Sequence, residues 1–226
     1  MNMAGKTLVL MLCLLATVVV ANATPPAKAV LFPSSDGGIV DADLYGHGVR
    51  GVVLAHGAAF DKKSWAPLAS RLVALGYSVL AIDFRGYGRS RGGNKPDGLD
   101  QDVIGAVRWL HAQGVKPVSV LGGSMGGGAA AEAATEMKRG ELAKLILLSP
   151  VPIKDPERID AGSILYIASR NEALEPEILD QYGRAPKPKK IVLLPGSAHA
   201  QNIFATPQSA RLTAIILQFL ASKPVR

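Results

Sequence analysis

The sequence predicts a single α/β domain in which helices cover both faces of a mostly parallel central sheet of about six to eight strands. Its 226 residues are enough for one such domain and too few for two ordinary ones. Short apolar runs alternate along the chain with stretches of helical periodicity. Neither an internal repeat nor a linker breaks this alternation, so we expect one core.

The predicted strands fall into two groups. Two short strands at 29–32 and 39–45 flank a Gly-rich turn. The other runs are rich in Val, Ile and Leu and barely alternate between apolar and polar residues, as strands covered on both faces do. They lie at 51–55, 78–83, 118–121, 145–148, 164–168 and 191–194.

Helices are predicted between these runs, at 65–75, 99–111, 125–138, about 174–182 and 207–220. A strand and a helix thus follow one another repeatedly, which favours parallel strands joined by right-handed crossovers. Sites in such sheets lie at the carboxyl ends of the strands. We therefore search for chemistry in the loops that follow strands.

Residues 1–23 have the pattern of a secretory signal peptide. Lys6 precedes an apolar run at 8–20, and Ala21-Asn22-Ala23 has the small-x-small pattern of a cleavage site. The alternative is an uncleaved anchor, but the run is shorter than the ~20 residues that a spanning helix needs. We expect an exported protein, periplasmic or secreted, with residues 24–226 as one domain and no stable membrane insertion after cleavage. The single cysteine, Cys13, would be removed with the signal.

The formal net charge of +7 does not indicate a nucleic-acid surface. The basic residues are spread among predicted loops, without the interleaved aromatic residues of such surfaces, so we expect solvated loop charges and no nucleic-acid partner. They include Lys62, Lys63, Arg85, Arg89, Arg91, Lys187, Lys189 and Lys190. No cluster has metal-ligand spacing and no phosphate-binding loop is present, so we expect neither a metal nor a cofactor.

One motif predicts a nucleophile. The strand at 118–121 leads into Gly122-Gly123-Ser124-Met125-Gly126, a G-x-S-x-G sequence followed at once by a helical stretch. A sharp turn in this context lifts the serine above the sheet, and glycines let the neighbouring chain pass close by. Ser124 is therefore the candidate nucleophile.

A serine hydroxyl needs a base within hydrogen-bond reach, and His199 is the candidate. It follows the strand at 191–194, at the sheet edge where a base is wanted. His47 and His111 have surface positions, and His56 has a structural one. The small residues after His56 leave backbone N–H groups free, so the amides of Ala58 and Met125 are candidate oxyanion donors.

Taken together, these motifs resemble the α/β-hydrolase superfamily. The resemblance rests on His56-Gly57, the loop from Asp83 to Ser90, Gly122–Gly126 and Pro195–His199, and covers about residues 29–220. The small size is similar to short esterases and to the dienelactone-hydrolase-like branch, which carries cysteine where this chain has Ser124. In that family a lid follows the strand after the nucleophile helix; only residues 149–163 are available here, so the resemblance implies no large lid.

The resemblance also implies an acidic partner for His199 after the preceding strand, and here the sequence departs from the usual aspartate. Glu172 falls at that position, or Asn171 if the loop is one residue shorter. We favour Glu172 because a carboxylate stabilises the imidazolium that forms during catalysis.

These residues predict a serine hydrolase that cleaves an ester, lactone, thioester or amide bond of a small-molecule acyl substrate through an acyl-enzyme. Two alternatives stay open: an acyltransferase that uses the same residues, and a ligand-binding protein without turnover.

Overall fold

The computed structural model describes residues 26–222. The signal segment predicted at 1–23 lies outside these residues, so its cleavage stays a prediction. Within the described part of the chain, no helix is both long enough and apolar enough to cross a bilayer.

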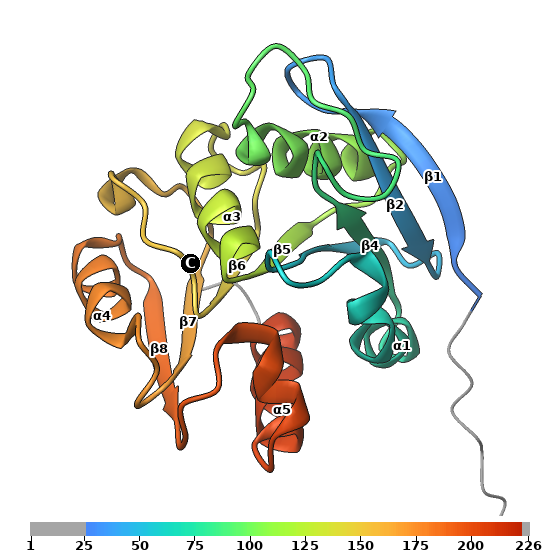
Figure 1. The fold of residues 1–226 in the computed structure, drawn as a ribbon. Coiled ribbons are helices and arrows are strands. Elements are labelled where there is room, and N and C mark those ends of the chain that lie inside the picture. Colours follow the sequence, from blue (N-terminus) through green and yellow to red (C-terminus); the bar gives the residue numbers. More distant parts are fainter. Residues whose placement is uncertain (1–25, 223–226) are drawn as a thin grey trace, which may run out of the picture.

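Eight strands form one sheet in the order β1-β2-β4-β3-β5-β6-β7-β8 (Figure 1). β2 is antiparallel to both β1 and β4, and all other neighbouring pairs are parallel. The strands are β1 (Lys28–Pro33), β2 (Ile39–Tyr45), β3 (Arg50–Ala55), β4 (Tyr77–Asp83), β5 (Val118–Gly123), β6 (Lys144–Leu148), β7 (Ile164–Ser169) and β8 (Lys189–Leu194). The α-helices are α1 (Ala66–Ala74), α2 (Leu99–Ala112), α3 (Met125–Glu136), α4 (Glu175–Arg184) and α5 (Ser209–Ala221).

The parallel strands are mostly apolar because each face of the sheet has its own core. In β4, Leu80 and Ile82 point into one core while Val79 and Ala81 point into the other. Helices α2, α3 and α4 cover the first core, and α1 and α5 cover the second. Figure 1 shows α2 and α3 on the opposite side of the sheet from α1 and α5.

The predicted α/β fold is confirmed, with every predicted strand and α-helix present. The sequence pattern did not indicate three short 3₁₀ helices, η1 (Lys62–Trp65), η2 (Pro156–Arg158) and η3 (Ala200–Ala205). They have no amphipathic periodicity, because three to six residues are too few to develop one. Residues 149–163 contain only η2, so no large lid covers the carboxyl edge of the sheet.

The expectation of solvated loop charges is wrong for Lys62 and Arg85, which are both only 7% exposed. Lys62 Nζ lies 2.8 Å from an Asp41 carboxylate oxygen and 3.4 Å from one of Asp43. A buried charge is tolerated only where an opposite charge pairs with it, and here the buried Asp41 and the partly buried Asp43 provide that pairing. The partners are distant in sequence, so composition alone does not indicate them.

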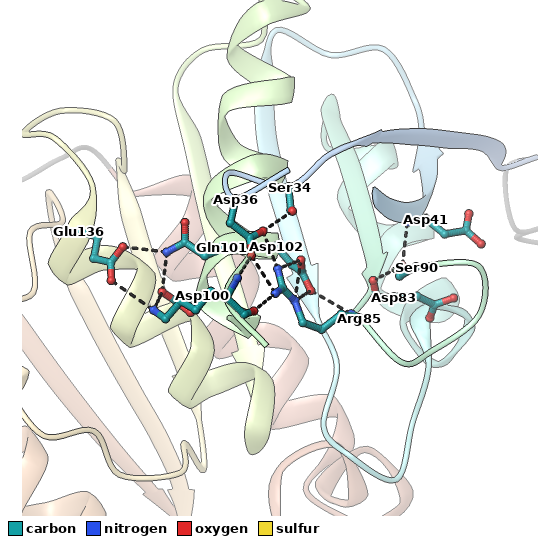
Figure 2. Close-up of polar contacts among 11 residues, drawn as sticks. Ser34, Asp36, Asp41, Asp83, Arg85, Ser90, Asp100, Gln101, Asp102 and Glu136 are labelled. Atoms are coloured by element: carbon teal, nitrogen blue, oxygen red, sulfur yellow. Dashed lines mark hydrogen bonds and ion pairs between the residues drawn. The ribbon is translucent and has the colours of Figure 1, made fainter. Parts of the chain in front are cut away.

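Arg85 is the centre of the larger network in Figure 2. Its guanidinium donates to Asp102 in the first turn of α2 at 2.8 Å and to Asp36 in the β1–β2 turn at 2.9 Å, and also to the Lys95 carbonyl. These Arg85 hydrogen bonds hold the pKa of the Asp36 carboxyl well below its ordinary value. Burial raises the pKa of Asp102, although Arg85 opposes that effect. The network ties the loop between β4 and α2 to two separate elements.

Candidate active site

Ser124 occupies a strained turn between β5 and α3. Its φ is +52°, in the left-handed region that non-glycine residues rarely adopt. A Cβ on Gly122 would lie 2.1 Å from the Gly126 carbonyl oxygen, and a Cβ on Gly126 would lie 2.5 Å from the Ala55 carbonyl oxygen. Only glycine fits at these two positions, so the G-x-S-x-G pattern is a packing requirement of the turn. Ser124 itself stays partly exposed at the carboxyl edge of the sheet.

His199 lies next to Ser124, in the loop between β8 and η3. The Ser124 hydroxyl lies 2.8 Å from His199 Nε2, and His199 Nδ1 lies 2.5 Å from a Glu172 carboxylate oxygen. Because a carboxylate can only accept, Nδ1 carries a proton, and in the neutral ring Nε2 accepts the hydrogen bond from Ser124. The His199 side chain is 35% exposed, whereas that of Glu172 is fully buried.

Glu172, and not Asn171, is the residue that contacts His199. The second carboxylate oxygen of Glu172 accepts hydrogen bonds from the Ser149 hydroxyl at 2.6 Å and from the Ser169 N–H at 2.8 Å. The Asn171 residue is exposed, and its backbone N–H donates to the Gly196 carbonyl. In the loop after β7, the Glu172 side chain therefore points into the protein, while Asn171 is exposed to solvent.

Ala58 belongs to a short turn at residues 56–58, directly after β3. A Cβ on Gly57 would lie 3.3 Å from Ser124 Cβ, so this turn packs against Ser124. The Gly57 carbonyl accepts hydrogen bonds from the Phe60 N–H at 2.9 Å and from the ring of His56 at 3.0 Å. In a trans peptide the N–H points opposite to the carbonyl, so these two bonds also orient the Ala58 N–H.

The N–H groups of Ala58 and Met125 have no hydrogen-bond acceptor among residues 26–222. Met125 is the first residue of α3, and the first N–H groups of a helix have no partner inside it. Two free donors thus flank the turn that holds Ser124. The Tyr87 hydroxyl donates to the Ala58 carbonyl at 2.9 Å and supports the 56–58 turn from outside.

The other histidines lie away from this chain of hydrogen bonds. His56 is fully buried, and its Nε2 accepts from the Phe84 N–H at 3.3 Å. Burial lowers the pKa of its imidazole, which keeps the ring neutral and structural. His47 is exposed, and His111 Nε2 lies 2.9 Å from the Glu141 carbonyl oxygen.

Sequence reasoning missed Ser149, Tyr87 and Gln201 around this site. Ser149 directly follows β6, so its position at a strand's carboxyl end was an available signal. Tyr87 lies in the loop from Asp83 to Ser90, and Gln201 lies two residues after His199. No residue pattern indicates the contacts that either side chain makes. In the described chain, no group of three or more His, Cys, Asp and Glu side chains is arranged to hold a metal ion.

Comparison with known families identifies the family of this chain. A family model described as serine aminopeptidase, S33, matches residues 47–171, a span that includes the 56–58 turn and Ser124 and ends one residue before Glu172. The chain belongs to this family of α/β hydrolases. The predicted membership of the superfamily is therefore confirmed.

Relatives of this S33-family chain are found in bacteria. An uncharacterized protein of Mycobacterium tuberculosis strain H37Rv is 28% identical over 212 residues, which cover 79% of this chain and 74% of the relative. A non-heme haloperoxidase of Rhodococcus erythropolis is 31% identical over 152 residues, 67% of this chain and 52% of the haloperoxidase.

Solved structures with the same fold include the esterase Pf2001 of Pyrococcus furiosus. It aligns with a TM-score of 0.73 at 20% identity, covering 86% of the S33-family chain and 89% of the esterase. A bromoperoxidase of Bacillus anthracis aligns with a TM-score of 0.71 at 16% identity, covering 86% and 100% of the two chains. At these identities the likeness concerns the fold alone.

Proposed function

We propose that this S33-family protein is a serine hydrolase that cleaves an ester or a related acyl bond of a small molecule through an acyl-enzyme. The hydrogen-bonded series Ser124–His199–Glu172 is the observation that carries the proposal. Its supports are the strained turn beneath Ser124 and the two free N–H groups beside it. Together they supply a nucleophile, a base, an acid partner and an oxyanion site.

In the first half of the reaction, Ser124 Oγ attacks the acyl carbon while its proton passes to His199 Nε2. The carbonyl oxygen becomes an anion, and the N–H groups of Ala58 and Met125 stabilise it. His199 then gives its proton to the leaving group, which departs and leaves Ser124 acylated. In the second half, His199 accepts a proton from water while the water oxygen attacks the acyl carbon. The bond between Ser124 Oγ and the acyl carbon then breaks, His199 returns its proton to Ser124 Oγ, and the carboxylic acid leaves.

Glu172 acts through His199 in both halves. When His199 accepts a proton it becomes a cation, and the adjacent buried carboxylate offsets that charge. The hydrogen bonds from Ser149 and Ser169 hold the carboxylate in place so that it faces Nδ1. Glu172 therefore orients the His199 ring and balances the positive charge of its imidazolium. It does not need to accept the proton that His199 takes up.

The expected substrates are small acyl compounds. Several proteins of this fold are named esterases, including Pf2001 of Pyrococcus furiosus and an esterase of Exiguobacterium antarcticum. The short 149–163 connection leaves the site without a large cover, which favours substrates bound at an open edge over long chains that need a tunnel.

Hydrolysis of p-nitrophenyl esters of increasing acyl length tests this proposal. We expect the wild-type protein to release p-nitrophenol, fastest with short acyl groups, and to do so in the presence of EDTA. Ser124→Ala removes the nucleophile and should reduce kcat by ~10⁴-fold or more, as in serine-hydrolase triads. Ser197→Ala is the matched control, because Ser197 is exposed in the same histidine loop and should leave the rate unchanged.

Three outcomes would contradict the proposal. A Ser124→Ala protein with a near wild-type rate would mean that the chemistry occurs elsewhere. Saturable binding of esters without release of product would favour a ligand-binding protein. Transfer of the acyl group to an added alcohol in strong preference to water would favour an acyltransferase.

A further inference from the structure

Gln201 is a buried polar residue that the proposed reaction does not use. It lies in η3, two residues after His199, and is only 5% exposed. A buried amide is stable only when its donors and acceptors are satisfied, so its partners indicate why it is there.

The Gln201 side chain connects two other segments. Its Oε1 accepts a hydrogen bond from the Gly57 N–H at 2.7 Å, and its Nε2 donates to the Ser64 hydroxyl at 2.7 Å. The Ser64 hydroxyl donates onward to the Asp61 carbonyl, so it is free to accept from Nε2. This pattern fixes which end of the amide is oxygen and which is nitrogen.

Gln201 also packs against the turn that holds Ser124. A Cβ on Gly123 would lie 3.4 Å from Gln201 Oε1 and 3.5 Å from Gln201 Cγ. The same side chain therefore contacts the 56–58 turn, the nucleophile turn and η1, while its backbone follows the histidine loop. No other side chain named in this site joins these segments.

We infer that Gln201 is a positioning residue that holds the 56–58 turn in a fixed place relative to His199 and Ser124. The inference rests on the proposed serine-hydrolase function. Gln201 Oε1 accepts a hydrogen bond from the Gly57 N–H. The peptide group that carries this N–H directly precedes the peptide group that carries the Ala58 N–H. Without Oε1, the buried Gly57 N–H lacks a partner, and the turn shifts to find one. The Ala58 donor then no longer meets the oxyanion.

A shifted donor weakens binding of the transition state more than binding of the substrate, because the oxyanion exists only in the transition state. Complete removal of one oxyanion donor costs ~10²–10³-fold in kcat. Misplacement costs less, so we expect Gln201→Met to reduce kcat by roughly 10–100-fold. KM for the same ester should change little.

Gln181 provides a matched control. It is also a buried glutamine, 2% exposed, and its Oε1 accepts a backbone N–H, that of Ile153, at 2.9 Å. Gln201→Met and Gln181→Met thus remove the same kind of buried amide and should lower thermal stability to a similar extent. Only Gln201→Met should lower kcat. A trifluoromethyl ketone, whose adduct with serine carries the oxyanion, should bind Gln201→Met more weakly by about the factor lost in kcat/KM.

Ser64→Ala is a second, milder variant in case Gln201→Met does not fold. Ser64 is exposed, and its loss releases the Nε2 end of the Gln201 amide, so we expect a smaller fall in kcat at unchanged KM. If the wild type is active, two results would overturn this inference and leave the proposed function standing. One is an unchanged kcat in Ser64→Ala, and the other is equal kcat values in Gln201→Met and Gln181→Met. A wild type that neither hydrolyses esters nor binds the trifluoromethyl ketone would overturn the proposed function as well.

Discussion

Three side chains from separate strand ends meet at the candidate site: Ser124 after β5, Glu172 after β7 and His199 after β8. The sequence indicates Ser124 and His199 because each follows an apolar strand at the sheet edge where a parallel fold gathers its chemistry. It leaves Glu172 and Asn171 open, since a difference of one residue in loop length decides which side chain turns inward. In the structure the Glu172 side chain is the one that turns inward, where its carboxylate accepts a hydrogen bond from the buried Ser149 hydroxyl. Sequence patterns do not connect Ser149 to either residue.

Replacing Glu172 with Gln tests the role of its charge. The amide keeps the shape of the carboxylate but does not balance the imidazolium, and a comparable change in a serine-protease triad costs ~10⁴-fold in kcat. We expect a loss of that order in ester hydrolysis at near-neutral pH, with a melting curve that shows the protein is folded. Asn171→Asp is the control, and it should have little effect because Asn171 is exposed. A silent Glu172→Gln combined with an activating Asn171→Asp would assign the acid position to Asn171 instead.

Among the elements, the loop between β4 and α2 contacts several segments that are distant from it in the sequence. Arg85 anchors it to Asp36 and Asp102, and Tyr87 extends from it to the Ala58 carbonyl (Figure 2 shows the Arg85 contacts). The sequence predicts a long Gly-rich loop here, but the ion pairs join residues that are 17 and 49 positions apart. Such pairs depend on the order of the strands, which residue composition does not determine.

Arg85→Met tests whether this network stabilises the protein. The substitution replaces the guanidinium side chain with a flexible apolar one, and it leaves the buried Asp102 carboxylate and the partly buried Asp36 carboxylate without their cationic partner. Breaking a buried pair from one side costs ~3–5 kcal/mol, and we expect a fall of that order in the free energy of unfolding by urea.

Arg91→Met is the control for that experiment. The Arg91 side chain is exposed and donates only to the neighbouring Ser90 carbonyl in the described chain, so the free energy should change by less than about 0.5 kcal/mol. Equal effects of the two substitutions would mean that the network adds no stability.

Across the whole molecule, the features that were predicted correctly are those with a repeating physical cause. Strands covered on both faces must be apolar throughout, and helices that cover a sheet must be amphipathic, so both leave patterns in the sequence. The 3₁₀ helices leave none because they are too short to develop a period, and the buried charges leave none because each depends on single contacts between distant residues. Gln201 belongs to this second group: it lies in a 3₁₀ helix and contacts Gly57, which is 144 positions away.

The central claim is that Ser124 is an activated nucleophile, and reaction with a fluorophosphonate followed by peptide mass spectrometry tests it most directly. Such a reagent phosphonylates a serine whose hydroxyl a neighbouring base has activated. We predict one adduct on the folded protein, on the peptide that contains Ser124, and no adduct after heat denaturation or in Ser124→Ala. An adduct on a different serine, or a folded protein that hydrolyses esters without reacting at Ser124, would contradict the account.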